Sequence, residues 1–352
     1  LNFHRTYYHP SNSYIYLYGD MDVEEKLRWM DEAYLSHFEK KEIMSEIPEQ
    51  KAFERPAEKT VYYGISDEEK EEEACYLSWN RVTGSVLDAR RYMAFQILEY
   101  ALLSAPGAPL KKALLDAGIG KDIYGGYDCS MRQTSFGVVA KGAGKEDLPR
   151  FVEEIEKTLR KLSEQGIRKK SLLAGLNHCE FKCREADFGS YPKGLMYGIQ
   201  CFDSWLYDDS APLLHLKYEE TFRFLKSQLD TGYFENLIRE YLLDNPHGAV
   251  VTLLPKKGYT EELEEKTAAE LARFQASLTE EELDGLVRDT AELKAYQEEP
   301  SPEEALRSVP MLKVSDIGKK AAGFQNEERS VCGLPAVFHE LFSGGIGYAG
   351  LL

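Results

Sequence analysis

The sequence lacks the features that most directly indicate a membrane, secreted or nucleic-acid-binding protein. No apolar run in its 352 residues approaches the ~18 residues of a membrane span. The opening, Leu1–Arg5, does not have the pattern of a signal peptide. The 43 Lys and Arg are outnumbered by 60 Asp and Glu, and the net charge of −17 argues against nucleic acid and anionic membranes as partners. This charge suits cationic peptides, but acidity for solubility alone is common.

Cysteine is scarce, and its spacing excludes a disulfide framework. The six cysteines are scattered, which indicates a reducing compartment. They are Cys75, Cys129, Cys179, Cys183, Cys201 and Cys332. Cys179 and Cys183 lie four apart on a predicted helix beside His178, a spacing that can bind a soft metal or pack on the buried side of the helix. No second cysteine pair completes a four-ligand site, so we favour packing.

Histidine pairs are also missing. A zinc peptidase needs two ligands on one helical face, a carboxylate that activates water and a third ligand from elsewhere. No two histidines are three or four residues apart, and the five-residue spacing of His4 and His9 fits neither a helix face nor a strand face. The seven are His4, His9, His37, His178, His215, His247 and His339. We predict no catalytic, cofactor-binding or metal-ligating residue in this chain, and no Ser/His/Asp set.

Two further patterns have plain structural interpretations. Paired carboxylates in a cleft can act as acid and base, but we expect Asp203, Asp208 and Asp209 to be surface carboxylates at a helix end. The glycine-rich stretches lack the strand–loop–helix setting of a phosphate-binding loop, so turns and strand ends are expected. They are Gly118–Gly120, Gly125–Gly126 and Gly344–Gly345.

The first forty residues predict one strand and one helix. Ser13–Gly19 is rich in aromatic and β-branched residues and predicts a buried strand. Asp22 can cap a helix over residues 23–38. These elements are too few to fold alone and the chain does not begin with Met, so we interpret residues 1–45 as the tail of a domain cut from a longer polypeptide. Polar residues 41–59 predict a linker.

Residues 46–258 alternate strand and helix patterns in the order β-β-α-α-β-β-α-α-α-α-β. The expected strands are 60–65, 74–82, 122–129, 134–141 and 248–254, and the main expected helices are 87–104, 109–118, 146–165, 169–186, 218–229 and 233–243. This order predicts an α+β domain with an antiparallel sheet and helices packed on one face.

The C-terminal hundred residues change character. Two helices joined by a short turn are predicted within 259–300, with Thr279 and Glu282 forming a capping box. This helical hairpin has few apolar residues for its length, so we expect it to link domains instead of forming a core. Residues 301–352 then predict the start of a further domain, with Phe338–Tyr348 as its first strand.

One segment, Phe188–Asp208, concentrates aromatic residues and glycines. Aromatics bury large areas and glycines let backbones approach closely, so the segment fits either a peptide-contacting wall or a packing device. Leu195, Ile199 and Phe202 fall at helical spacing and are predicted to face a core, which favours packing. On this interpretation Trp205→Ala destabilises the fold by roughly 3–5 kcal/mol.

Phe188–Leu195 (Phe-Gly-Ser-Tyr-Pro-Lys-Gly-Leu) and Trp205–Asp208 (Trp-Leu-Tyr-Asp), with the opening Phe3–Asp20, carry a family resemblance that covers nearly the whole chain. The chain resembles the presequence-protease branch of the insulinase (pitrilysin) zinc metallopeptidases. The resemblance implies that residues 1–45 end a catalytic first domain and that 46–258 form a non-catalytic second domain.

The resemblance also implies a four-domain peptidase whose two halves close on a peptide-sized chamber. Such enzymes carry the inverted zinc motif His-x-x-Glu-His, which is absent here. Zinc ligands would lie upstream of Leu1, and an Arg and Tyr that touch substrate would lie downstream of Leu352. We expect an inactive fragment that supplies chamber wall and hinge to a cytoplasmic zinc-dependent endopeptidase of unstructured oligopeptides. The alternative is a peptide-binding or scaffolding relative that also lost the motif when full-length.

Overall fold

The computed structural model describes residues 2–320, 323, 325–340 and 343–350. They divide into two compact units. The first runs through Lys257 and includes the tail from Gly344, and the second spans Gly258–Ser343. Among the described residues, every buried hydrophobic side chain belongs to the first unit. The predicted domain limits at residues 45, 258 and 300 remain predictions.

The first unit is built on a five-stranded sheet with the strand order β1-β5-β2-β4-β3. The strands are β1 (Ala57–Ile65), β2 (Cys75–Ser85), β3 (Asp122–Asp128), β4 (Gln133–Ala143) and β5 (Gly248–Lys257). Every neighbouring pair is antiparallel except β1 and β5, which run parallel with Ala57 opposite Ala249. The expected antiparallel sheet is therefore confirmed with one parallel pair, which joins strands from opposite ends of the domain and has no local sequence pattern.

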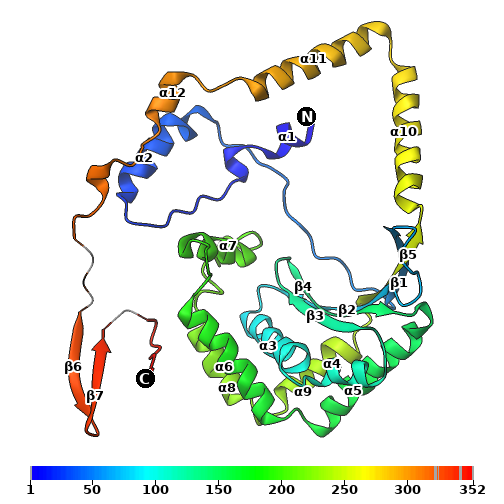
Figure 1. Ribbon diagram of the computed structural model, residues 1–352, viewed down its shortest axis with the longest axis vertical. Coiled ribbons are helices and arrows are strands. Elements are labelled where there is room, and N and C mark those ends of the chain that lie inside the picture. Colours follow the sequence, from blue (N-terminus) through cyan, green and yellow to red (C-terminus); the bar gives the residue numbers. More distant parts are fainter. Residues whose placement is uncertain (1, 321–322, 324, 341–342, 351–352) are drawn as a thin grey trace. The chain divides into compact units, whose positions relative to one another are not determined.

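Helices cover one face of this sheet (Figure 1). They are α3 (Ala89–Glu99), α4 (Pro109–Asp116), α5 (Leu148–Gln165), α6 (Lys169–Glu185), α8 (Glu219–Ser227) and α9 (Tyr233–Leu237). The shorter turns are the π-helical segments Tyr100–Ser104 and Ile238–Leu243 and the 3-10 turn Lys145–Asp147. Helices α3 and α5 lie against the sheet, and α6 and α8 pack against α3. The predicted α+β architecture is confirmed.

The core lies between the sheet and these helices. Alternate residues of β2 are buried, and Leu77 and Trp79 are fully so. Phe95 of α3, Phe136 of β4 and Phe151 of α5 are also fully buried in the same cluster. Burial of each such side chain stabilises the fold by about 1.5–3 kcal/mol, so this unit has a substantial core of its own.

The first forty residues depart from the prediction. Residues 14–18 are extended but form no strand, because their backbone has no hydrogen-bonded neighbour among the described residues. They are not buried either, since Tyr18 is 56% exposed. Asp22 does cap a helix, as predicted, and its carboxylate accepts a hydrogen bond from the Glu25 N–H at 3.0 Å. The elements of this region are α1 (Asn2–Tyr7), α2 (Val23–Ala33) and the 3-10 turns Pro10–Asn12 and Leu35–His37.

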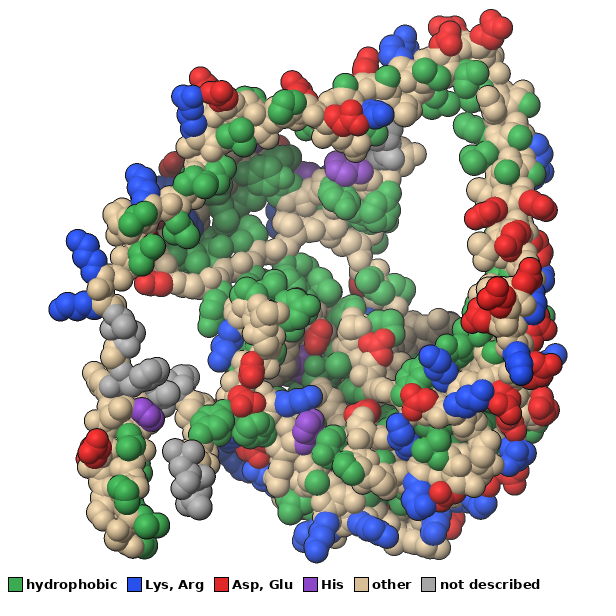
Figure 2. Space-filling view, viewed as in Figure 1, with side chains coloured by type: hydrophobic (Ala, Val, Ile, Leu, Met, Phe, Trp, Pro, Cys, Tyr) green, Lys and Arg blue, Asp and Glu red, His purple; other side chains and the backbone are tan. Residues whose placement is uncertain are grey.

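The second unit contains helices and a two-stranded hairpin. Its elements are α10 (Tyr259–Ser277), α11 (Glu280–Glu298), α12 (Glu303–Ser308), the 3-10 turn Val314–Asp316, β6 (Asn326–Val331) and β7 (Leu334–His339). The predicted capping box is present, with Glu282 N–H donating to Thr279 Oγ1 at 3.3 Å and Thr279 N–H donating to Glu282 Oε2 at 2.8 Å. No residue of α10 or α11 is buried, and hydrophobic side chains are visible along both helices (Figure 2).

The predicted strand over Phe338–Tyr348 is mostly wrong. Phe338 and His339 end β7, which pairs antiparallel with β6. Leu341 and Phe342 lie outside the described residues, and residues 343–350 form no strand. The pairing partner of β7 is the preceding segment, so the apolar run is the second strand of a hairpin instead of the first strand of a sheet.

Candidate functional site

The aromatic segment folds into a loop and the helix α7 (Lys193–Trp205), which begins directly after Pro192. This helix buries its small residues, which are Gly194, Gly198, Cys201 and Ser204. Leu195 and Ile199 are 52% and 50% exposed, so the prediction that they face a core is wrong. Phe202 is half-buried. Leu195 and Ile199 are exposed because the opposite, glycine-containing face of α7 is the one that packs, and it packs against large side chains of another segment.

That other segment is the extended stretch at residues 14–18. A Cβ atom placed on Gly194 would lie 2.0 Å from a ring carbon of Tyr18, and one on Gly198 would lie 2.8 Å from the ring of Tyr16. The ring of Tyr14 meets the ring of Trp205 edge-on, with 4.8 Å between centroids. The segment Phe188–Asp208 therefore has a packing role here. Alternating tyrosines were the available sequence signal, but their partner could not be identified from it.

The three predicted surface carboxylates have three separate partners and form no acid–base pair. Asp208 accepts hydrogen bonds from the Ser210 N–H at 2.8 Å and from its hydroxyl at 2.6 Å. Asp209 accepts one from the Tyr14 hydroxyl at 3.1 Å. Asp203 is not a surface group: it is half-buried and accepts a hydrogen bond from the Tyr92 hydroxyl of α3 at 3.1 Å. The prediction is wrong for Asp203 because the C-terminal turns of α7 pack toward α3.

Burial sets the protonation of the groups around Tyr92. It raises the pKa of Asp203 to about 6, although the hydrogen bond from Tyr92 acts in the opposite direction. His215 stacks on Tyr92 with 3.8 Å between ring centroids, and burial lowers its pKa to about 4. Its Nε2 atom has no hydrogen-bond partner among the described residues. The cluster joins α3 to residues 203–215, more than a hundred residues further along the chain, and for that reason no local sequence pattern indicated it.

The Cys179 and Cys183 pair lies on α6, as predicted. Burial raises the pKa of these thiols to about 12 and about 11, as expected for small side chains packed against the core. His178 stacks on Tyr100 with 4.4 Å between ring centroids. Within the described part of the chain, no group of three or more His, Cys, Asp or Glu side chains is placed to hold a metal ion. The arrangement favours packing.

The glycine-rich stretches also have structural positions. Gly118 and Gly120 both have φ of +70° in the turn between α4 and β3, where glycine avoids strain. Gly125–Gly126 lies within β3, and Gly344–Gly345 is a turn with positive φ. The expected turns are present at Gly118–Gly120 and Gly344–Gly345, whereas Gly125–Gly126 lies in the middle of a strand and not at a strand end.

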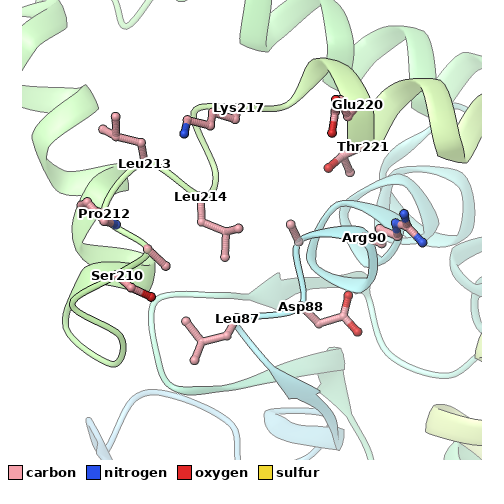
Figure 3. A pocket seen from close by; sticks show the side chains of 12 residues that line it. Leu87, Asp88, Arg90, Ser210, Pro212, Leu213, Leu214, Lys217, Glu220 and Thr221 are labelled. Carbon is pink, nitrogen blue, oxygen red and sulfur yellow. The ribbon is translucent and has the colours of Figure 1, made fainter.

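A groove of about 820 Å³ lies between the start of α3 and the loop that joins α7 to α8. Leu214 points across it toward Leu87, and Lys217 and Glu220 lie at its rim (Figure 3). Neither Lys217 nor Glu220 has an ion-pair partner among the described residues. An apolar floor with free charges at the rim can bind a short peptide segment. Sequence reasoning missed this groove because its lining comes from residues 87–90 and 210–221, which carry no shared motif.

Comparison with known families and proteins matches both ends of the chain. Residues 1–177 match the family model described as the peptidase M16 inactive domain, and residues 253–352 match the model of the region associated with subfamily C of these peptidases. Protein HypA of Clostridium perfringens is 41% identical over 348 residues, which cover 99% of this chain and 36% of HypA. Presequence protease 1, chloroplastic/mitochondrial, of Arabidopsis thaliana is 36% identical, covering 98% of this chain and 33% of its own length. The chain spans about a third of these curated relatives.

Solved structures share the fold at low sequence identity. A protease from Helicobacter pylori aligns with a TM-score of 0.52 at 14% identity, covering 72% of this chain and 57% of that one. A conserved protein from Enterococcus faecalis aligns with a TM-score of 0.50 at 12% identity, covering 68% of this chain and 51% of that one.

None of the described helices has the length and hydrophobicity that a membrane crossing requires.

The mostly antiparallel sheet, its single helical face and the matched model define a domain of the inactive M16 type. The chain belongs to the peptidase M16 family, in its presequence-protease-like branch.

Proposed function

We propose that this chain is the non-catalytic portion of a zinc-dependent endopeptidase that degrades unstructured oligopeptides, and that it supplies wall and hinge to a peptide-sized chamber. The observation that carries the proposal is the match of residues 1–177 to the inactive-domain model in a sequence without His-x-x-Glu-His. Relatives named presequence proteases are about three times as long as the chain, which leaves room for a zinc-bearing region elsewhere. The partners would be a peptide substrate and the remaining domains of the same polypeptide.

The test compares this chain with the full-length product of its gene. Elemental analysis should find one equivalent of zinc on the full-length protein and none on this chain. An unstructured fluorogenic peptide should be cleaved only by the full-length protein, and a chelator should abolish the cleavage. Stoichiometric zinc with chelator-sensitive cleavage by this chain alone would overturn the proposal.

A second candidate function is peptide binding without catalysis, and the groove beside α3 favours it. Here the full-length protein would also lack the zinc motif, so translation of the gene upstream of Leu1 separates the two candidates. Under peptide binding, Lys217→Ala should weaken binding of an unstructured peptide several-fold. Lys170→Ala removes a lysine that is also exposed but lies away from the groove, and it should leave binding unchanged.

A cytoplasmic location is part of the same proposal. It rests on the scattered free cysteines. Relatives named mitochondrial or chloroplastic indicate that location varies within the branch. Cell fractionation of the full-length protein tests it, and recovery in an organelle would contradict it.

A further inference from the structure

The contact between residues 14–18 and α7 follows a regular ladder. Tyr18 lies on Gly194 near the start of the helix, and Tyr16 lies on Gly198 one turn later. Tyr14 meets Trp205 near the end of the helix. The extended segment therefore runs antiparallel to α7. Tyr18 and Tyr16 lie on Gly194 and Gly198, four residues apart, and Tyr14 contacts Phe202 and Trp205, four and seven residues further along, with 6.0 and 4.8 Å between ring centroids.

The ladder is possible because two repeats nearly match. Two residues of extended chain advance about 6.6 Å, and four residues of α-helix advance about 6 Å. Tyrosines at alternate positions therefore stay in step with Gly194 and Gly198, which lie on one face of the helix. The absence of a Cβ at both glycines lets the tyrosine rings reach the helix backbone.

The segment is held by side chains alone. Its Tyr14 hydroxyl donates a hydrogen bond to Asp209 at 3.1 Å, while the backbone of residues 14–18 bonds to no described residue. The tyrosines are not more buried than the side chains between them, since Tyr14 and Tyr18 are 37% and 56% exposed and Ile15 and Leu17 are 44% and 37% exposed. The contact is therefore a surface contact, made by the tyrosine rings on the glycine face of α7 without backbone hydrogen bonds.

We propose that this tyrosine ladder is a clamp that holds the N-terminal region against the sheet domain, and that the clamp transmits the position of the non-catalytic domain to the catalytic region of the full-length protein. The second half of this statement rests on the proposed function, whereas the clamp itself does not. In the full-length protein the clamp would act as a positioning element.

The first test uses limited chymotrypsin cleavage of this chain, because the amides of residues 14–18 have no hydrogen bonds among the described residues whose loss exchange could report. Gly194→Ala places a methyl group where the Tyr18 ring lies, yet alanine favours a helix more than glycine does. Cleavage after the tyrosines of residues 13–19 should therefore accelerate at least tenfold while α7 itself stays helical. Gly285→Ala is the matched control on α11, where the nearest atom to the new methyl is a flexible arginine end at 3.9 Å, and it should leave the cleavage rate unchanged.

A variant on the other side of the contact covers the case in which Gly194→Ala does not fold. Tyr16→Ala alters only the extended segment, so it should release residues 13–19 without reducing protection in β5. Tyr14→Phe removes the hydrogen bond to Asp209 and should give a smaller acceleration. Unchanged chymotrypsin cleavage within residues 13–19 of folded Gly194→Ala and Tyr16→Ala variants would overturn the clamp.

The second test measures coupling in the full-length protein. Gly194→Ala should lower kcat/KM for an unstructured peptide several-fold with zinc content unchanged, and Gly285→Ala should have no effect. Full activity in the Gly194→Ala protein would overturn the coupling. A wild-type full-length protein without zinc or peptide cleavage would instead overturn the proposed function and leave the clamp to be decided by chymotrypsin cleavage of this chain.

Discussion

Asp203 is a half-buried carboxyl whose pKa burial raises well above the usual value. Its pKa is about 6, against 3.8 for an ordinary Asp. Between those values the folded state keeps the proton and the unfolded state loses it, so stability falls as pH rises from about 4 to about 6. Two pKa units correspond to about 3 kcal/mol, and solvent screening of this half-buried group reduces the effect to about 1 kcal/mol.

We therefore predict that Asp203→Asn gains about 1 kcal/mol of unfolding free energy over the wild type between pH 4 and pH 7. Asparagine keeps an oxygen that can accept the Tyr92 hydrogen bond but does not ionise. His215 acts in the opposite direction, since its lowered pKa makes stability rise over pH 4 to 6.5. That contribution is present in both proteins and cancels in the difference. Urea unfolding at both pH values measures it, and parallel pH profiles would contradict the prediction.

Two tryptophans test how far burial controls stability. Trp79 is fully buried in the core, whereas Trp205 is only partly buried and contacts Tyr14 and Phe202. We predict that Trp79→Ala costs about 3–5 kcal/mol of unfolding free energy. Trp205→Ala should cost only about 1–2 kcal/mol, less than its sequence suggested, because less apolar area returns to water. Equal losses in denaturant unfolding would show that the α7 contact is as firm as the core.

At the scale of elements, the sequence predicted the sheet domain well. Helices and strands with strong periodicity and a clear turn or cap, such as α5 ending before Gly166 and the capping box at Thr279, have the predicted type and nearly the predicted bounds. The predictions that were wrong concern which other segment an element pairs with or packs against. Residues 14–18 have a strand pattern, but a pattern does not supply a neighbouring strand. The parallel pair β1–β5 and the exposed faces of Leu195 and Ile199 likewise depend on contacts between distant segments.

The same limit applies to the candidate sites. The absence of the zinc motif, the position of Cys179 and Cys183 on a helix and the importance of Phe188–Asp208 followed from local residue types. The Tyr92 cluster, the groove beside α3 and the tyrosine ladder each join segments more than a hundred residues apart. Local residue spacing does not encode contacts between such distant segments, so they can be identified only from the three-dimensional structure.

The helices α10 and α11 should be far more dynamic than the sheet. No residue of either helix is buried, whereas β5 lies inside the sheet with alternate residues buried. Amide exchange depends on local opening, which buried contacts oppose. We predict that residues 260–298 exchange at least tenfold faster than residues 248–254, as measured by hydrogen exchange with mass spectrometry. Equal protection would mean that these helices have firm contacts of their own.

At the scale of the whole molecule, stability should reside in the sheet unit alone. All buried hydrophobic side chains of the described residues lie between Cys75 and Leu254. The returning tail adds surface contacts, among which the Tyr348 hydroxyl donates a hydrogen bond to Glu185 at 2.8 Å and Gly344 lies against the Arg184 backbone. A surface hydrogen bond contributes about 1 kcal/mol, which shifts the melting temperature of a domain of this size by about 2–4 °C.

Two truncations follow from this distribution of buried residues. A chain ending at Lys257 should melt cooperatively within about 4 °C of the full chain. A chain ending at His247 loses β5, the strand between β1 and β2, and with it the only sheet neighbour of β1 among the described residues. It should show no cooperative melting transition by circular dichroism.

A large loss of stability in the Lys257 truncation would show that residues beyond 257 support the sheet. A cooperative transition in the His247 truncation would mean that β2, β3 and β4 with their helices form a stable core without β5.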